Sequence, residues 1–238
     1  MNPIIEKIRQ ELKSIADPVA AESSKRFFKE DQLIKVYGIK TPIVIKIAKE
    51  HLKKLSNEPK GTIYSLCEEL WKSGIIEEIC IACEWAYAQR KLFSEDDFAV
   101  FDRWVKNYVT NWAACDTLCN HTIGTFVEMY PSYLNELKKW TKSDNRWVKR
   151  AAAVTLIIPG KKGIFADDIF DIATLLMTDT DDMVQKGYGW LLKATSGTYP
   201  QRVFDFVNSH KATMPRTALR YAIEKLPAEM KREAMQKD

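Results

Sequence analysis

Residues Asp144–Ile158 read DNRWVKRAAAVTLII, and this stretch carries the pattern that decides the fold. Asn145 is a residue type that caps helices, because its side chain accepts a hydrogen bond from a free N–H group of the first turn. Apolar residues then recur at steps of three or four, at Trp147, Ala151, Val154 and Ile158. This period is typical of an amphipathic helix, so the stretch predicts a helix that begins just after Asn145.

The same opening recurs along the chain. Asn111, Asn145, Asp181 and Thr213 are cap-type residues before apolar-periodic segments, and they follow one another at intervals of 34, 36 and 32 residues. A similar start lies near Ser73, and another amphipathic segment precedes each of these helices. A unit of two helices repeated about every 35 residues is the mark of an α-solenoid, in which neighbouring pairs bury each other's apolar stripes.

The predicted fold class is therefore all-α, a HEAT-like helical-repeat solenoid, because the signature residues of tetratricopeptide repeats are missing. The second helices of adjacent repeats are expected to lie side by side and to form a concave face. Residues 1–55 predict an N-terminal helical cap. Within it, YGIKTP (Tyr37–Pro42) interrupts the pattern before a helix that begins near Thr41 or Pro42.

About five helix pairs are expected between residues 59 and 227, and no linker divides the chain, so residues 1–238 are expected to form a single domain. A hydrophobic fraction of 46% with 29% charged residues argues against disorder. No apolar run approaches the roughly 18–20 residues of a membrane span. The N-terminus lacks the pattern of a signal peptide, and five cysteines suggest reduced thiols, so a cytoplasmic protein without a membrane partner is expected.

The net charge is only +4, but the charged residues are unevenly distributed along the chain. Residues 138–162 hold eight basic side chains against one acid, whereas residues 165–184 carry six aspartates and no base. Such runs are usually solvated helix faces, although polarised blocks also fit a protein with one face for a polyanion.

The repeat register brings polar residues together. Asp116, Arg150 and Lys186 each stand five residues after a cap, so stacked second helices would place them next to one another. Trp112 lies one turn before Asp116, and Trp190 lies one turn after Lys186. The alternative is that both tryptophans belong to the core and that Arg150 forms an ion pair with Asp116.

A family resemblance covers residues 25 to 227. The segments NWAACD (111–116), DNRWVKRAA (144–152), VQKGYGWLLK (184–193) and MPRTALRYAIEKLP (214–227), together with YGIKTP, resemble the AlkD-like family of DNA alkylation-repair glycosylases. No single motif is specific, but five in register are. One position departs from the family pattern, since Ala113 stands where an acid often follows the first tryptophan.

The resemblance implies a HEAT-like solenoid that holds duplex DNA in its concave face and excises N3- or N7-alkylated purines. In this sequence, the family's catalytic carboxylate corresponds to Asp116. The two aromatic residues that flank the lesion correspond to Trp112 and Trp190, and the basic residue beside it corresponds to Arg150. The expected contacts with the DNA backbone are Lys40, Thr41, Lys46, Lys149, Lys186, Lys193, Arg216 and Arg220.

These residue types suit the chemistry. An alkylated cationic purine leaves with little or no protonation, and a carboxylate can stabilise the oxocarbenium-like state and place a water. The expected partner is double-stranded DNA containing alkylated purines, bound by a monomer that is cytoplasmic and nucleoid-associated and has neither cofactor nor metal. The alternatives are a catalytically inactive HEAT-like DNA-binding protein and a protein-interaction scaffold.

Other residue groups are weaker candidates. Cys80 and Cys83 have the CxxC spacing of redox and zinc sites but lie in a helical pattern without a second pair, which favours core packing. Cys115 and Cys119 share one helix stripe from which His121 points away, so they too are expected in the core. The segments PGKKG (159–163) and GYG (187–189) match no nucleotide fingerprint; a loop and a close helix contact are expected there.

Overall fold

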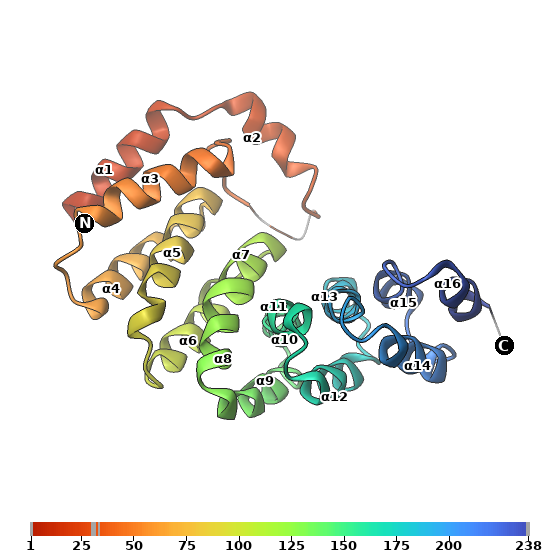
Figure 1. Cartoon of the computed structure of the whole chain (residues 1–238). Helices are drawn as coiled ribbons and strands as arrows, with labels where there is room; N and C mark the ends of the chain where they lie inside the picture. Colours follow the sequence, from red (N-terminus) through yellow and green to blue (C-terminus); the bar gives the residue numbers. More distant parts are fainter. Residues whose placement is uncertain (1, 30–31, 33, 237–238) are drawn as a thin grey trace. The chain divides into compact units, whose positions relative to one another are not determined.

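A computed structural model describes residues 2–29, 32 and 34–236. The chain is 72% helical, which confirms the all-α fold class. In the described ranges, β pairing is limited to an isolated bridge between Lys35 and Ile75. The helices group into two compact units, Met1–Leu118 and Cys119–Asp238, which are described separately below (Figure 1). The expectation of a single domain stays a prediction.

The first unit begins with α1 (Pro3–Ser14), α2 (Pro18–Lys25) and α3 (Thr41–Lys53). It continues with α4 (Lys60–Trp71), α5 (Ile76–Ala88), a 3₁₀ turn (Gln89–Leu92), α6 (Asp97–Tyr108) and α7 (Trp112–Thr117). Helix α5 packs against α3 on one side and against α7 on the other, while α4 also covers α5 (Figure 1). The core of this unit contains the fully buried tryptophans Trp71, Trp85 and Trp104.

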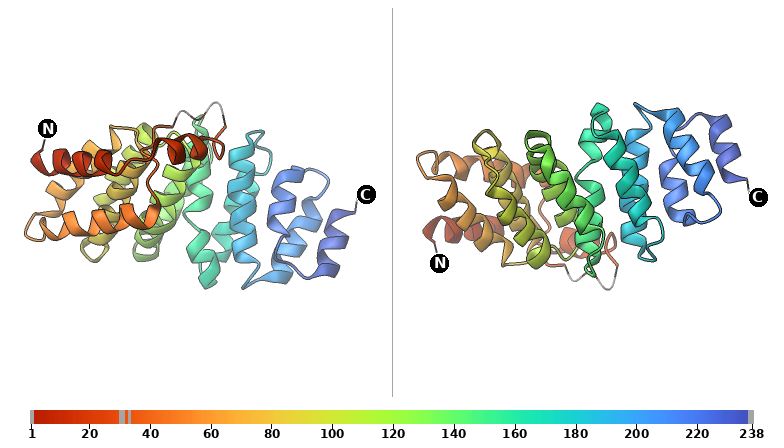
Figure 2. Two further views of the ribbon diagram at one scale, coloured as in Figure 1. Left: turned by 90° about the horizontal axis from the view of Figure 1, so that it is seen from above. Right: turned by 90° about the horizontal axis from the view of Figure 1, so that it is seen from below.

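The second unit contains α8 (Gly124–Met129), a 3₁₀ turn (Pro131–Tyr133), α9 (Leu134–Trp140), α10 (Arg146–Val154) and α11 (Ile157–Lys162). It ends with α12 (Ala166–Leu176), α13 (Asp182–Thr195), α14 (Pro200–His210), α15 (Arg216–Ala222) and α16 (Ala228–Met235). A π-helical turn, Leu118–Ile123, precedes α8. Helix α13 packs against α10 and against α15 (Figure 2), so the second helices of successive pairs are neighbours within this unit, as the repeat pattern predicts.

Three of the predicted caps are confirmed. The side chain of Asn111 accepts a hydrogen bond from the N–H of Ala114 at 2.9 Å, and Asn145 accepts one from Trp147 at 2.9 Å. Asp181 binds the N–H of Met183 at 2.8 Å in the same way. These bonds satisfy donors that a helix start leaves without a partner, which explains why the helices begin where the sequence indicates.

The prediction for Thr213 is wrong. Its N–H and its hydroxyl both donate to the carbonyl of His210, so Thr213 closes α14 rather than opening the next helix. Helix α15 begins at Arg216, with Pro215 as the preceding residue and without a side-chain cap. Proline can stand there because its fixed φ suits the entry to a helix and a missing N–H costs nothing.

The expected loop at PGKKG is also wrong, because Pro159–Lys162 lie in α11 and only Gly163 is left-handed, with φ of 74°. The apolar run from Trp147 is split instead, since α10 ends at Val154 and α11 begins at Ile157. Pro159 has no N–H for the carbonyl of Thr155, four residues earlier, so one continuous helix could not keep its hydrogen bonds.

The break at YGIKTP is confirmed, and α3 begins at Thr41. Gly38 has φ of 83°, and a Cβ atom there would lie 2.2 Å from the carbonyl oxygen of Asp17 and 2.6 Å from the backbone nitrogen of Ala21. We therefore expect Gly38→Ala to destabilise the protein by about 1–3 kcal/mol, since backbone strain and a backbone clash combine. Urea denaturation measures this, and Gly61→Ala, at a helical site with open space around the Cβ position, is the matched control.

No helix in the described ranges has both the length and the apolar character that a membrane crossing requires.

Candidate functional site

Two of the seven tryptophans differ from the rest. Five of them, Trp71, Trp85, Trp104, Trp140 and Trp147, are buried at 7% exposure or less. Trp112 and Trp190 are both partly exposed. Since a buried tryptophan is the ordinary case in a core, the two that remain accessible are the ones that can contact a ligand.

Helix α7 presents Trp112 and Asp116 one turn apart. Asn111, which is 1% exposed, fixes the start of this helix through its bond to Ala114. Asp116 is partly exposed on the same helix face as Trp112. The short helix therefore carries an accessible carboxylate beside an accessible aromatic ring.

The ring of Trp112 has a partner that the sequence did not suggest. Phe28 stacks on it with 5.3 Å between ring centroids and 20° between ring planes, and the indole N–H donates to the carbonyl of Phe27 at 3.3 Å. One face of the indole is thus covered by the segment after α2. The signal in the sequence is the pair Phe27–Phe28 among basic residues, which is unusual for an exposed segment.

In the second unit, Arg150 is a buried residue of α10 with 5% exposure. Its Nη1 donates to the carbonyl of Met183 at 2.6 Å, and Gly187 of α13 leaves room for its aliphatic chain. Lys186 and Trp190 stand one turn apart on α13, and Lys186 forms an ion pair with Asp182 at 2.9 Å. Because α10 and α13 pack together, Arg150 and Lys186 lie on adjacent helices, as the repeat register predicts.

The GYG segment is a close helix contact, as predicted. A Cβ on Gly187 would lie 3.3 Å from Cγ of Arg150. On Gly189 it would lie 2.8 Å from the carbonyl oxygen of Ala218 and from Cβ of Tyr221. Only glycine lets α13 approach α15 this closely.

Several of the expected DNA-binding cations already have protein partners. Lys149 binds Asp179, Lys193 binds Glu224 at 2.6 Å, and the guanidinium of Arg216 donates to the carbonyl of Met235 at 3.4 Å. For these side chains, a phosphate would have to replace or share an existing partner. Such replacement lowers the net gain from each contact.

Other expected contacts are more accessible. Lys40, Thr41 and Arg220 are exposed, and Lys40 and Arg220 form no ion pair within the described part of the chain. Lys46 is exposed, and its Nζ lies 3.9 Å from Oε1 of Glu50, which is a weak ion pair at the surface. Among the expected contacts, Lys40 and Arg220 therefore have the fewest competitors for a phosphate.

The charged blocks of the sequence pair with one another in the second unit. Lys138 of the basic run binds Asp168 at 2.8 Å and Asp171 at 2.7 Å in the acidic run, and Arg146 binds Asp181 at 2.9 Å. The two runs occupy neighbouring helix pairs, so opposite charges meet across the repeat. A polyanion face thus cannot be inferred from the basic block alone.

The predicted site residues are distributed over both units. Trp112, Asp116, Lys40, Thr41 and Lys46 belong to the first, whereas Arg150, Trp190 and the remaining basic residues belong to the second. Their convergence on one surface stays a prediction.

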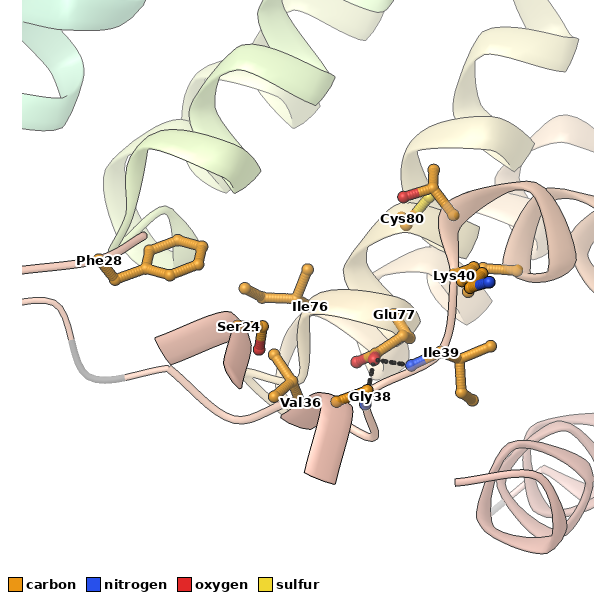
Figure 3. Close-up of a pocket in the computed structure, with 12 residues that line it drawn as sticks. Ser24, Phe28, Val36, Gly38, Ile39, Lys40, Ile76, Glu77 and Cys80 are labelled. Atoms are coloured by element: carbon orange, nitrogen blue, oxygen red, sulfur yellow. Dashed lines mark hydrogen bonds between the residues drawn. The ribbon is translucent and has the colours of Figure 1, made fainter. Parts of the chain in front are cut away.

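A pocket of about 270 Å³ lies in the first unit between α2, α3 and α5 (Figure 3). Its wall includes Phe28, Lys40, Glu77 and Cys80. Burial raises the pKa of Cys80 to about 12, so its thiol stays protonated at neutral pH, unlike a reactive redox cysteine. Cys83 is buried, in agreement with the core packing that the sequence predicts for it.

Cys115 and Cys119 are fully buried, and His121 is exposed, as their spacing predicts. Within the described ranges, no three histidine, cysteine or acidic side chains gather as a metal site would require.

Comparison with known proteins first gives the class of fold. A solved structure described as a predicted DNA alkylation repair enzyme from Enterococcus faecalis matches with a TM-score of 0.78 at 20% identity. The match covers 90% of this chain and 97% of that one, so the two share an all-α helical-repeat fold. None of the curated proteins matches the chain.

A family model then gives the particular group. The model of the DNA alkylation repair enzymes matches residues 8–226, which is most of the chain. The chain belongs to this family, and DNA is therefore its substrate.

Proposed function

We propose that this protein is a DNA glycosylase that hydrolyses the N-glycosidic bond of N3- and N7-alkylated purines in duplex DNA. The observation that carries the proposal is the pair Trp112 and Asp116, an accessible tryptophan and an accessible carboxylate one turn apart in a chain of this family. Trp190 is the second accessible tryptophan. The protein acts as a monomer in the cytoplasm and associates with the nucleoid.

The reaction needs a single carboxylate and no general acid. An alkylated purine already carries positive charge, so the bond from C1′ to the base nitrogen breaks with its electron pair moving to the base, and no general acid is needed. The sugar passes through an oxocarbenium-like state, which the carboxylate of Asp116 stabilises electrostatically. The same carboxylate orients a water that adds to C1′ and accepts one proton from it, which leaves an abasic sugar with a hydroxyl on C1′.

The two accessible tryptophans can stabilise the same positive charge on the sugar. The face of an indole ring attracts a cation, so a deoxyribose packed on Trp112 or Trp190 is stabilised as it becomes positive. Phe28 covers one face of Trp112, which leaves the remaining part of the ring for the sugar.

Incubation with methylated duplex DNA tests the proposal. We expect the wild-type protein to release 3-methyladenine or 7-methylguanine, detected by chromatography of the free bases, with no added metal or nucleotide. Protein that binds this DNA without releasing a base would refute the glycosylase assignment and leave a DNA-binding repeat protein. A panel of lesions in the same assay gives the preferred adduct.

Salt dependence separates DNA binding from a role as a protein-interaction scaffold. Each phosphate contact by a lysine or arginine should make the log of the affinity for duplex DNA fall by about 0.9 per log unit of salt. Affinity that is absent or insensitive to salt would favour the scaffold.

A further inference from the structure

Glu77 is a buried carboxylate in the first turn of α5 whose binding partners are backbone N–H groups. It is 5% exposed, and its Oε1 accepts from the N–H of Tyr37 at 3.0 Å, Gly38 at 2.8 Å and Ile39 at 3.1 Å. Figure 3 shows the bonds to Gly38 and Ile39. Its Oε2 accepts from the N–H of Tyr37 at 3.0 Å as well. Three consecutive donors on one carboxylate form an anion-binding nest.

The position of the nest matters because it lies directly before α3. The three bound residues belong to the YGIKTP break, and the next two residues are Lys40, which precedes the helix, and Thr41, which begins it. Both are exposed, and Lys40 has no ion pair within the described ranges. The backbone that presents these two side chains is therefore held by Glu77.

Other contacts confine the same break. The N–H of Asp17 donates to the carbonyl of Tyr37 at 3.0 Å, and the N–H of Ile76 donates to the carbonyl of Lys35 at 2.9 Å. Gly38 fits only because it has no side chain. The phenol of Tyr37 also donates to the carboxylate of Glu78 at 2.9 Å, which holds the side chain of Tyr37. Among these contacts, Glu77 is the charged group that binds the backbone of residues 37–39, and hydrogen bonds to an ionised group are stronger than those between neutral groups.

We propose that Glu77 is a positioning residue of the DNA interface, which fixes the YGIKTP break so that Lys40 and Thr41 face a backbone phosphate. The inference rests on the proposed function in one respect, the expected phosphate contacts of Lys40 and Thr41. Its test uses undamaged duplex DNA, so it can fail or succeed independently of base release.

The sign of the effect makes the proposal testable. Glu77→Gln removes a negative charge near the DNA, and electrostatics alone would then raise the affinity for a polyanion. Loss of positioning acts in the opposite direction. We expect Glu77→Gln to weaken binding about tenfold, the equivalent of one charge-assisted hydrogen bond. The plot of log affinity against log salt should become shallower by about 0.9, the value of one phosphate contact.

The matched control is Asp97→Asn. Asp97 is also a buried carboxylate in the first turn of a helix of this unit, with 4% exposure, but it binds Lys60 at 2.8 Å and the N–H of Ser94 at 2.9 Å. Both substitutions remove a buried charge and should lower the melting temperature. Only Glu77→Gln should change the salt slope.

Two further variants complete the test. Lys40→Ala, an exposed change that leaves the fold intact, should flatten the salt slope by about 0.9. Adding Glu77→Gln to it should not flatten the slope again. Glu77→Asp keeps the charge and should lie between the wild type and Glu77→Gln in affinity.

Any of four results would overturn the proposal. The first is a DNA affinity of Glu77→Gln that equals or exceeds that of the wild type, and the second is a salt slope that changes as much in Asp97→Asn as in Glu77→Gln. The third is an unchanged salt slope in Lys40→Ala. The fourth is a salt slope that falls by about a further 0.9 when Glu77→Gln is added to Lys40→Ala. If Glu77→Gln does not fold, the salt slope of Lys40→Ala and the DNA affinity of Glu77→Asp still test the proposal. An unchanged slope in the first, or wild-type affinity in the second, would overturn it.

Discussion

Asp116→Asn is expected to slow the release of cationic alkylated purines by about 100-fold or more while duplex DNA is still bound. The amide keeps the size of the side chain on α7 but removes the negative charge that stabilises the oxocarbenium-like state, and loss of one such electrostatic contact typically lowers a rate by about 10²–10³-fold. Single-turnover base release at saturating protein measures the chemical step, and fluorescence anisotropy with labelled duplex measures binding.

The matched control is Asp102→Asn, the same chemical change on α6 in the same unit. Asp102 forms an ion pair with Lys106 at 2.8 Å, a surface contact of adjacent helical turns. We expect its rate of base release to equal that of the wild type. A rate of Asp116→Asn within a few-fold of the wild type would show that another group supplies the charge, and weaker DNA binding by this variant would assign Asp116 a role in binding.

Much of the fold could be predicted because its signals are local. The side chains of Asn111, Asn145 and Asp181 bond to N–H groups two or three residues away, so a short segment of sequence is enough to predict where each of these helices begins. The prediction for Thr213 was wrong because a threonine hydroxyl can bond at the end of one helix as well as at the start of the next, and residue type alone does not distinguish the two. Pro215 was the better signal, and with it the spacing of the last two starts becomes 34 residues.

The candidate site was less predictable because its details depend on distant residues. Helical spacing puts Trp112 and Asp116 on one face, but the stack of Phe28 on Trp112 joins residues 84 positions apart. The neutralisation of Lys138 and Lys149 by aspartates of the next repeat likewise depends on packing between helices. Glu77 stands in the first turn of α5, where the helix dipole favours any acid, and no neighbouring residue in the sequence indicates that it binds the backbone of residues 37–39.

Arg9→Met is expected to have the largest effect on stability among surface-accessible substitutions, about 3 kcal/mol in the free energy of unfolding. Glu78 of α5 is fully buried, and Nε and Nη2 of Arg9 donate to its Oε2 at 3.0 and 2.9 Å. Hydrogen bonding to Glu78 raises the pKa of Arg9, because the carboxylate favours the charged guanidinium. Removing one partner of a buried ion pair leaves a charge without compensation, and this costs about 3–5 kcal/mol.

Urea denaturation at pH 7 measures the change, and Lys7→Met on the exposed side of α1 is the control, with little effect expected. The phenol of Tyr37 also donates to Glu78, at 2.9 Å. Burial is the main cause that raises the pKa of Tyr37 above its usual 10, so its contribution is intact below pH 10 and is lost only as the pH rises further. At pH 7 the phenol therefore still donates in the variant.

A second substitution identifies the cause of the loss. If the buried charge is responsible, Arg9→Met combined with Glu78→Gln should recover a large part of the stability, because no ion is then left without a partner. If α1 instead depends on the aliphatic packing of the Arg9 side chain, methionine would preserve it and the single change would be mild. A single cooperative transition is expected throughout, since Ile5, Ile8 and Leu12 of α1 stay fully buried and keep this helix in the core of the first unit.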